Sequence, residues 1–248
     1  MKFKKGAITG LAVIIIIIAG ITAVIVYQKN AERSALANRI FSMGSPNQAT
    51  SIVDLKASIA KYEGRIARHV RDAVQAGVYW KILAVRMQDR GLHGEALGAL
   101  EHAIYYTPED PALHYYTGVS AGIVAKSLHL FPGTENDDRK RFFDLAEDAY
   151  LHAIELDNRY MRPLYGLGVL YVFELDRPED AIPYLERCLV LSRNDVDTMF
   201  VLARAHFILR NYQTAIDLYD RIITLTRDEQ KRREAQENRQ FILGQMHG

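Results

Sequence analysis

The sequence predicts an all-α protein: an α-solenoid of about four helix pairs with flanking helices, preceded by one N-terminal transmembrane helix. Three observations predict this fold class. An uncharged, strongly apolar run spans residues 6–27. Beyond residue 50, apolar residues recur at three- and four-residue spacing, and no stretch alternates apolar and polar residues as a strand would. One arrangement of small and bulky residues then recurs four times between residues 77 and 227.

The run at 6–27 is predicted to be a transmembrane helix. At about 1.5 Å per residue it reaches roughly 33 Å, which is enough to cross the hydrocarbon core of a bilayer. Its five consecutive isoleucines suit lipid on all sides better than an amphipathic packing surface. A buried core helix and a cleaved signal peptide are the alternatives. The exit "AVIVYQKN" lacks the small residues that a cleavage site usually has.

The short basic N-terminus, residues 1–5, sets the expected orientation. Lys2, Lys4 and Lys5 precede the apolar run, and such a cluster favours an N-terminus inside the cell. The chain after the run would then lie outside the cytoplasm. We therefore expect a single-pass protein of a bacterial inner membrane, with its helical part in the periplasm.

Two segments separate this anchor from the repeated part. Residues 28–50 form a linker, because they are polar and interrupted by Gly44 and Pro46. Residues 51–76 form an amphipathic entry helix whose apolar stripe is Ile52, Leu55, Ile59, Tyr62, Ile66, Val70 and Val74. The arginines at 65, 68 and 71 indicate a solvated face or a contact with acidic lipid headgroups.

The repeated arrangement predicts helix pairs stacked in series. Four segments, at 95–104, 145–154, 180–189 and 214–223, each place an alanine four residues before a bulky residue. The alanines are Ala96, Ala146, Ala181 and Ala215, and the bulky residues are Leu100, Tyr150, Leu185 and Tyr219. The helix before each segment carries a small residue, at Ala84, Gly118, Gly168 and Ala203. Antiparallel helices approach closely only where side chains are small, and bulky residues fill the gaps beside them.

In these positions the chain resembles the tetratricopeptide repeat (TPR) family over residues 77–227. The first unit matches the family pattern best, with Trp80, Leu83, Ala84, Met87, Gly91, Ala96, Leu100, Ala103 and Pro108 in place. Later units lack the tryptophan, and Asn158, Arg193 and Arg227 replace the terminal proline. The resemblance implies units at 77–110, 111–160 with an insertion, 161–195 and 196–227, and then a C-terminal capping helix at 228–248. The insertion, near 122–141, adds about 16 residues. The apolar residues around its tip form a local cap or a second docking point, and they are Leu128, Leu130, Phe131, Phe142 and Phe143.

One motif suggests an enzyme. Gly118-Val119-Ser120-Ala121-Gly122 fits the G-x-S-x-G pattern of a serine hydrolase. That motif requires a strand entering a sharp turn with the serine at its apex, whereas Ser120 falls in the middle of a predicted helix. We interpret Ser120 as a packing residue and expect no catalytic residue.

Composition and motifs exclude several other classes of function. The net charge of +1 argues against a nucleic-acid partner, because phosphate binding needs a basic surface. Cys188 is the only cysteine, and no Walker A loop, dinucleotide fingerprint or zinc-protease motif occurs. His152 and Glu155 share a helix face, but no further metal ligand is evident. We expect no cofactor, metal or small-molecule substrate.

The resemblance implies a groove lined by the first helix of each pair, which commonly binds peptides or helices in this family. By repeat phase the partner-binding residues would be Lys81, Tyr115, Tyr116, Arg162, Tyr165, Val169, Phe173, Phe200, Arg204 and Phe207. Aromatic residues and arginine are enriched at interfaces. The alternative is that these aromatics pack between helix pairs or lie under the protein's own termini. The family's carboxylate clamp is not expected, because Val85 and Val119 stand among its positions.

These observations favour a membrane-tethered scaffold or adaptor that binds other proteins in the cell envelope, with chaperone and assembly roles among its possible forms. A constitutive structural subunit of a membrane complex is one alternative, and a hydrolase that uses Ser120 is another. Mitochondrial import receptors share this architecture but would require the opposite topology.

Overall fold

The computed structural model describes residues 30–31, 34, 52–128 and 136–247. These residues form helices joined by turns, and no strand occurs among them. The helices are α2 (Ile52–Asp89), α3 (His93–Tyr106), α4 (Pro111–Leu128), α5 (Asn136–Leu156), α6 (Met161–Phe173), α7 (Pro178–Leu191), α8 (Val196–Ile208), α9 (Tyr212–Leu225) and α10 (Glu229–His247). The prediction of an all-α solenoid is confirmed for this part of the chain.

The chain divides into two units, Met1–Ile66 and Ala67–Gly248. The transmembrane helix predicted at 6–27 lies outside the described residues, as does most of the linker at 28–50. Among the helices that the structure does describe, none is both long enough and apolar enough to cross a bilayer.

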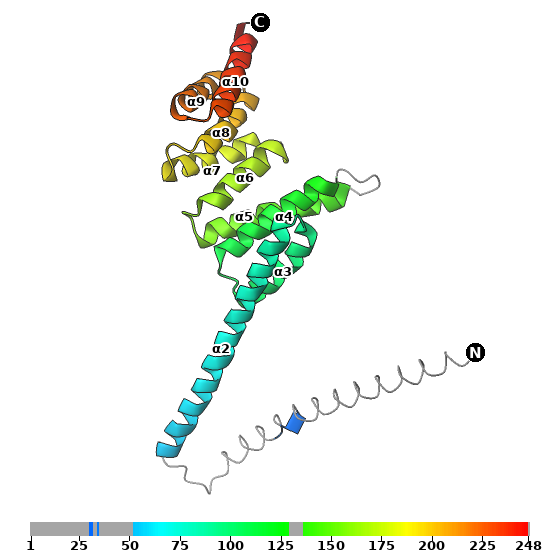
Figure 1. The fold of residues 1–248 in the computed structure, drawn as a ribbon, viewed down its shortest axis with the longest axis vertical. Helices are drawn as coiled ribbons and strands as arrows, with labels where there is room; N and C mark the ends of the chain where they lie inside the picture. The colour runs from blue at the N-terminus through cyan, green and yellow to red at the C-terminus, as the bar shows by residue number, and fades with distance from the viewer. Residues whose placement is uncertain (1–29, 32–33, 35–51, 129–135, 248) are drawn as a thin grey trace, which may run out of the picture. The chain divides into compact units, whose positions relative to one another are not determined.

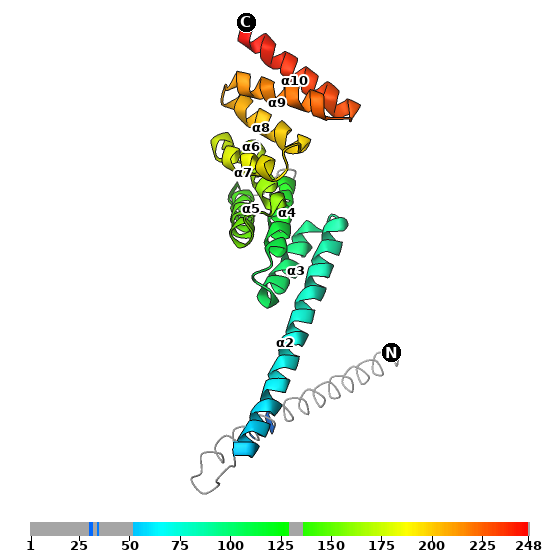
Figure 2. The same cartoon turned by 90° about the vertical axis from the view of Figure 1, so that its left-hand side faces the viewer.

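Within the second unit the helices form successive antiparallel pairs (Figures 1 and 2). The later turns of α2 pair with α3, where Trp80 stacks on His102. The next pairs are α4 with α5, α6 with α7 and α8 with α9, and α10 packs on α9. The entry helix expected at 51–76 and the first helix of the first pair are one continuous helix, α2, with no break at residue 77. Gly77 stands at that point, but it is buried inside the helix, and an added Cβ there would lie 2.9 Å from that of Tyr106. This glycine therefore allows close packing on α3 and does not end the helix.

Close approach of the paired helices depends on the small residues of the repeat. An added Cβ at Gly118 would lie 2.6 Å from the Tyr150 ring, and one at Gly168 would lie 2.5 Å from the Leu185 side chain. Tyr150 also lies against Gly166, where a Cβ would stand 2.9 Å from the ring. In the second and third pairs, the bulky residue of the second helix therefore occupies the space that the small residue of the first helix leaves empty.

The turns within three of the pairs each contain one residue with a positive φ. Gly91, Asp176 and Arg210 each adopt a positive φ, of 75°, 53° and 60°. In the first and last of these turns the next amide donates to a carbonyl five residues back, Leu92 to Met87 and Asn211 to His206. This is the Schellman arrangement, which favours glycine at the left-handed position. Asp176 and Arg210 adopt the left-handed conformation without the conformational freedom of glycine.

The second pair is longer than the others. α4 has 18 residues and α5 has 21, whereas α6 has 13 and α7 has 14. Phe143 is buried and Phe142 is partly buried against the core, so both belong to the packing of the extended pair. The segment between the two helices, residues 129–135, lies outside the described residues, and so do Leu130 and Phe131.

A polar contact joins the second pair to the third. The Tyr171 hydroxyl of α6 donates to the Glu147 carboxylate of α5 over 2.8 Å. Arg177, in the turn after α6, donates to both oxygens of the same carboxylate, at 2.9 and 3.1 Å. Its guanidinium also lies 4.5 Å from the centre of the Tyr171 ring. Burial, and then the bond to Glu147, raises the pKa of Tyr171 well above its usual value, so this phenol stays protonated and remains a donor.

Candidate functional site

The first helices α4, α6 and α8 lie side by side and form one surface, which we call the first-helix face. It is the surface on which the sequence placed the partner-binding groove. At α4 and α6 this face carries an open cleft, whereas at α8 it contacts the C-terminal helix α10.

Aromatic residues gather where α4 and α6 begin. The Tyr115 ring lies 5.3 Å from that of Tyr116, 5.6 Å from that of Tyr160 and 6.3 Å from that of Tyr150. The Arg162 guanidinium lies 6.0 Å from the centre of the Tyr115 ring. Burial raises the pKa of Tyr115 and of Tyr160, and the nearby Arg162 opposes that rise. Three predicted residues, Tyr115, Tyr116 and Arg162, therefore meet in one cluster.

An apolar cleft of about 200 Å³ follows, between α4 and α6. Val119, Gly122 and Ile123 of α4 line one side, and Gly166, Val169 and Leu170 of α6 line the other. Lys126 and Glu174 close one end with an ion pair of 2.8 Å. A cleft of this size accommodates one large apolar side chain rather than a whole ligand.

Tyr150 reaches this cleft from α5. Gly118 and Gly166 leave room for its ring between the two first helices, and the residue lines the cleft. Its hydroxyl has no hydrogen-bond partner among the described residues. Burial raises the pKa of Tyr150 far above its usual value, so the hydroxyl keeps its proton well into the alkaline range and remains a donor there. The cleft thus combines apolar walls with one polar group.

The remaining predicted residues of the first and third pairs have different surroundings. Lys81 pairs with Asp110 at 2.7 Å, so its charge is already compensated within the protein. Tyr165 is partly buried against the core, and burial raises its pKa. Phe173 is 53% exposed near the cleft's charged end, and Val169 lines the cleft itself.

At α8 the chain's own C-terminal helix contacts the first-helix face. The Phe207 ring lies 5.8 Å from that of Phe241 of α10, and Lys231 of α10 pairs with Asp197 of α8. Arg204 lies over the Phe207 ring at 5.3 Å. Phe200 packs on Tyr219, with ring centres 6.0 Å apart. The alternative interpretation, that some of these aromatics lie under a terminus or pack between helices, therefore describes the fourth pair.

Ser120 has the surroundings of a packing residue. It lies inside α4 and is fully buried. The Gln88 amide donates to its hydroxyl over 2.7 Å, and the nearest imidazole nitrogen, on His93, is 3.5 Å away. No strand or turn presents it to solvent, which the hydrolase motif would require.

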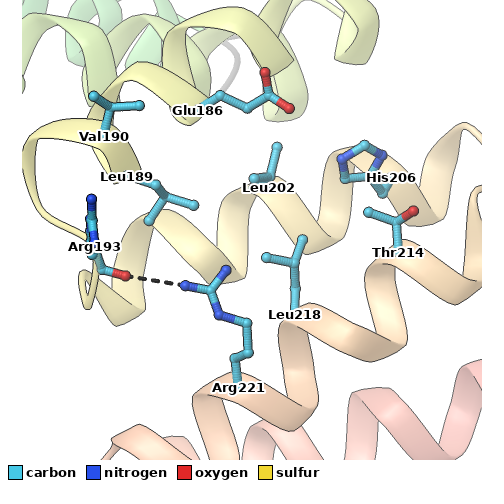
Figure 3. Close-up of a pocket in the computed structure, with 9 residues that line it drawn as sticks. All are labelled: Glu186, Leu189, Val190, Arg193, Leu202, His206, Thr214, Leu218 and Arg221. Carbon is cyan, nitrogen blue, oxygen red and sulfur yellow. Dashed lines mark hydrogen bonds between the residues drawn. The ribbon is translucent and has the colours of Figure 1, made fainter.

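A second hollow lies on other elements, and sequence reasoning missed it (Figure 3). It has a volume of about 440 Å³ and is lined by α7, α8 and α9. Leu189, Leu202 and Leu218 supply apolar side chains to it. At one end the Arg221 guanidinium donates to the carbonyl of Arg193 over 3.2 Å. Glu186 and His206 also line it, and burial lowers the pKa of His206. Arg193 follows the end of α7, and the other lining residues occupy ordinary positions of their own helices, so no local motif marks this hollow.

Among the described residues, no group of three histidine, cysteine, aspartate or glutamate side chains could hold a metal ion. His152 does contact Glu155, at 3.3 Å, and its ring also lies 4.4 Å from that of His114.

Comparison with known proteins agrees with the repeat pattern. Residues 171–230 match the model of the tetratricopeptide repeat family. A TPR repeat-containing protein of Borreliella burgdorferi is 20% identical over 192 residues, which cover 77% of this chain and 81% of that protein. Both matches show that this chain is similar to TPR proteins.

Solved structures show the same fold. A thermophilic TPR protein of Thermus thermophilus superposes with a TM-score of 0.54 at 15% identity, covering 84% of this chain and 96% of that one. MamA from Desulfovibrio magneticus RS-1 superposes with a TM-score of 0.53, also at 15% identity, covering 68% of this chain and 94% of that one. At this level of identity the likeness concerns the fold alone.

Proposed function

We propose that this protein is a membrane-tethered adaptor that binds other proteins of the cell envelope through the first-helix face at α4 and α6. TPR folds are protein-interaction scaffolds, and that general role agrees with the helix stack described above. The finer parts of the proposal are the binding surface, the tether and the location.

The cleft between α4 and α6 is the observation that carries the binding surface. It is apolar, it is open, and Ile123 and Phe173 beside it remain 40% and 53% exposed. Apolar side chains exposed around a hollow mark a surface that a partner covers. The equivalent surface at α8 already contacts α10 through Phe207.

The chemistry of the cleft defines the partner. A large apolar side chain would enter between Val119 and Val169, and the Tyr150 hydroxyl would donate to a carbonyl of the same segment. Arg162 and the tyrosines at the start of α4 would contact an acidic or aromatic neighbour. The partner is therefore a helix or an extended peptide anchored by one buried apolar residue.

The tether in this proposal is the apolar run at 6–27, with the N-terminus inside and the repeats in the periplasm of a bacterial inner membrane. Confinement to a membrane raises the effective concentration of the adaptor toward partners in that membrane. Paired reporter fusions at the C-terminus test the topology. The reporter that works only outside the cytoplasm should be active, and activity of the cytoplasmic reporter alone would overturn the assignment.

A matched pair of variants tests the binding surface. In cells that express the full chain, in vivo crosslinking followed by purification identifies bound proteins. Ile123→Glu places a charge in the cleft and should abolish the adducts that the wild type forms. Val190→Glu changes an equally apolar residue that is 78% exposed beside the second hollow, and it should leave them unchanged. The reverse result would assign binding to the hollow on α7, α8 and α9.

The constitutive-subunit alternative predicts a different behaviour of the same partners. An adaptor exchanges its partners, so a pulse of tagged chain should appear in existing complexes within the time course of the experiment. A fixed subunit would be incorporated only into newly made complexes and at constant stoichiometry. A chaperone or assembly role would additionally require that the partner be bound before it reaches its final complex.

A further inference from the structure

The early turns of α2 present an apolar stripe to solvent. We call Ile52, Leu55, Ile59, Tyr62 and Ile66 the α2 seam. Ile52, Ile59 and Ile66 are 73%, 55% and 61% exposed, and Leu55 is 43% exposed. A helix that leaves one continuous side of large apolar residues in water is incomplete by itself.

In its later part, the corresponding side of α2 packs against another helix, α3. Gly77 is buried, and a Cβ there would lie 2.9 Å from that of Tyr106, the last residue of α3. Three residues later, Trp80 stacks on His102 with ring centres 4.4 Å apart. α3 has 14 residues and α2 has 38, so α2 continues N-terminally well past the last of these contacts.

The spacing of the α2 seam identifies a second helix as its occupant. The five residues alternate steps of three and four, which is the heptad pattern of a coiled coil. Isoleucine occupies the first apolar position in three successive heptads, and leucine and then tyrosine occupy the second. A β-branched residue at the first position with leucine at the second favours a two-stranded, parallel pairing. Such a seam is complementary to itself.

A lipid surface fits the α2 seam less well. Glu63 lies one turn after Ile59 and three residues before Ile66, so it borders the apolar stripe, as does Lys56. A helix lying in a membrane would have to take the Glu63 carboxylate toward the acyl chains, which is costly. In a coiled coil the same position flanks the seam and faces water, where charged residues are usual.

We propose that two copies of this chain associate through the α2 seam as a parallel, in-register coiled coil. The adaptor then presents two first-helix faces, and a partner with two binding segments gains avidity. The association rests on the seam itself, whereas its parallel orientation also follows from the proposed tether, which would hold both N-termini in one membrane.

Cysteine crosslinking tests the pairing. Cys188 is buried, and replacing it by alanine gives a full-length background without other thiols. In a mild detergent, Ile59→Cys should form a disulfide-linked dimer under oxidation, because residue 59 meets its own counterpart in a parallel pair. Lys61→Cys, on the opposite side of the helix, should remain monomeric on a non-reducing gel. Equal crosslinking of both variants would overturn the proposal. It would also be overturned if the protein has the mass of a dimer but Ile59→Cys forms no disulfide.

Charge substitutions provide the second measurement. Sedimentation of the full chain should give twice its mass of 28.2 kDa. Ile66→Glu places two carboxylates face to face and should raise the dimer dissociation constant at least about tenfold. Ala57→Glu, on the far side of the same helix, should leave it unchanged, and circular dichroism checks that both variants stay helical. A monomeric wild type would overturn the proposal. It would also be overturned if the Ile59→Cys variant forms no crosslink and its thiol is protected from a water-soluble thiol reagent only when anionic vesicles are added, because the seam would then contact lipid.

The experiments distinguish a failure of the dimer proposal from a failure of the proposed binding function. Loss of the dimer in Ile66→Glu leaves the α4–α6 cleft intact, and Ile123→Glu leaves the seam intact. Each variant therefore reports on one surface only.

Discussion

Over α4 and α6 the first-helix face is open, with the cleft between Val119 and Val169 and an exposed Phe173 beside it. Over α8 the same face contacts α10, which places Phe241 against Phe207 and Lys231 against Asp197. Both regions carry the aromatic and arginine residues that the sequence assigned to the groove. The comparison shows that residue type and repeat phase do not distinguish an open part of this face from a part that a terminal helix covers.

The covering helix gives the largest expected effect. Ile242 of α10 is 2% exposed, and Ile242→Ala should lower the free energy of unfolding by about 2–4 kcal/mol, because it leaves a cavity in the core. Urea unfolding measures this change, and hydrogen exchange should show α8 exchanging faster. Phe241→Ala is the control, since this ring is 57% exposed and should cost less than about 1 kcal/mol. Equal effects of the two variants would mean that α10 is not a structural cover.

The glycines below the open region come next. Gly118→Ala forces the Tyr150 ring to move, because the added Cβ would lie 2.6 Å from it, and should destabilise by about 1–3 kcal/mol. Gly122→Ala lies one turn later in the same helix with no atom within 4 Å, and should stabilise by up to about 1 kcal/mol. Thermal or urea unfolding of the pair compares them. If both variants stabilise the protein, the contact between Gly118 and Tyr150 does not determine how closely the two helices approach each other.

The junction between the second and third pairs has a smaller expected effect. Tyr171→Phe removes one donor from the Glu147 carboxylate and should cost about 1–2 kcal/mol, because hydrogen bonds to charged groups exceed neutral ones. Tyr184→Phe is the matched control, since its ring lies 6.0 Å from that of Tyr171 and should change stability by less than about 0.5 kcal/mol. If Tyr171→Phe leaves the free energy of unfolding unchanged, Arg177 alone satisfies the hydrogen-bonding needs of the Glu147 carboxylate.

The smallest effect at neutral pH is expected at the floor of the cleft. The Tyr150 hydroxyl has no partner among the described residues, so Tyr150→Phe should change stability at pH 7 by less than about 0.5 kcal/mol. Burial raises the pKa of Tyr150 above that of an unfolded tyrosine, which is about 10. The folded state therefore keeps a proton that the unfolded state loses, and its contribution to stability, complete below about pH 10, falls as the pH rises further.

Unfolding titrations at about pH 9 and pH 11 check this pH dependence. The wild type should lose more stability between the two than Tyr150→Phe does. An identical loss in both proteins would assign the alkaline sensitivity to the other buried phenols, such as Tyr171, rather than to the cleft.

The fold was largely predictable because its determinants are local. The spacing of Ala96 to Leu100 and of Ala215 to Tyr219, and the small residues Gly118 and Gly168, each lie within one helix, and each predicts its own packing. The continuous α2 was missed for a physical reason. A helix boundary was inferred from where the repeat begins, but Gly77 at that point is a buried contact with α3 inside a continuous helix.

The candidate site was predictable only in part. Tyr115, Tyr116 and Arg162 meet because repeat phase places them at the start of neighbouring first helices. Tyr160 and Tyr150 complete this cluster from a turn and a second helix, which repeat phase does not reveal. The contact of Phe241 with Phe207 and the hollow on α7, α8 and α9 depend on how distant helices pack, and no local pattern encodes either of them.

Site-specific photocrosslinking is the most direct test of the central claim that partners bind the open part of the first-helix face. A photoreactive amino acid placed at Ile123, Phe207 or Val190 of the full chain samples the cleft, the surface beside α10 and the second hollow in turn. Adducts to the same partner from position 123, and none from positions 207 and 190, are the predicted result. Adducts from position 207 or 190 with none from position 123 would contradict the account.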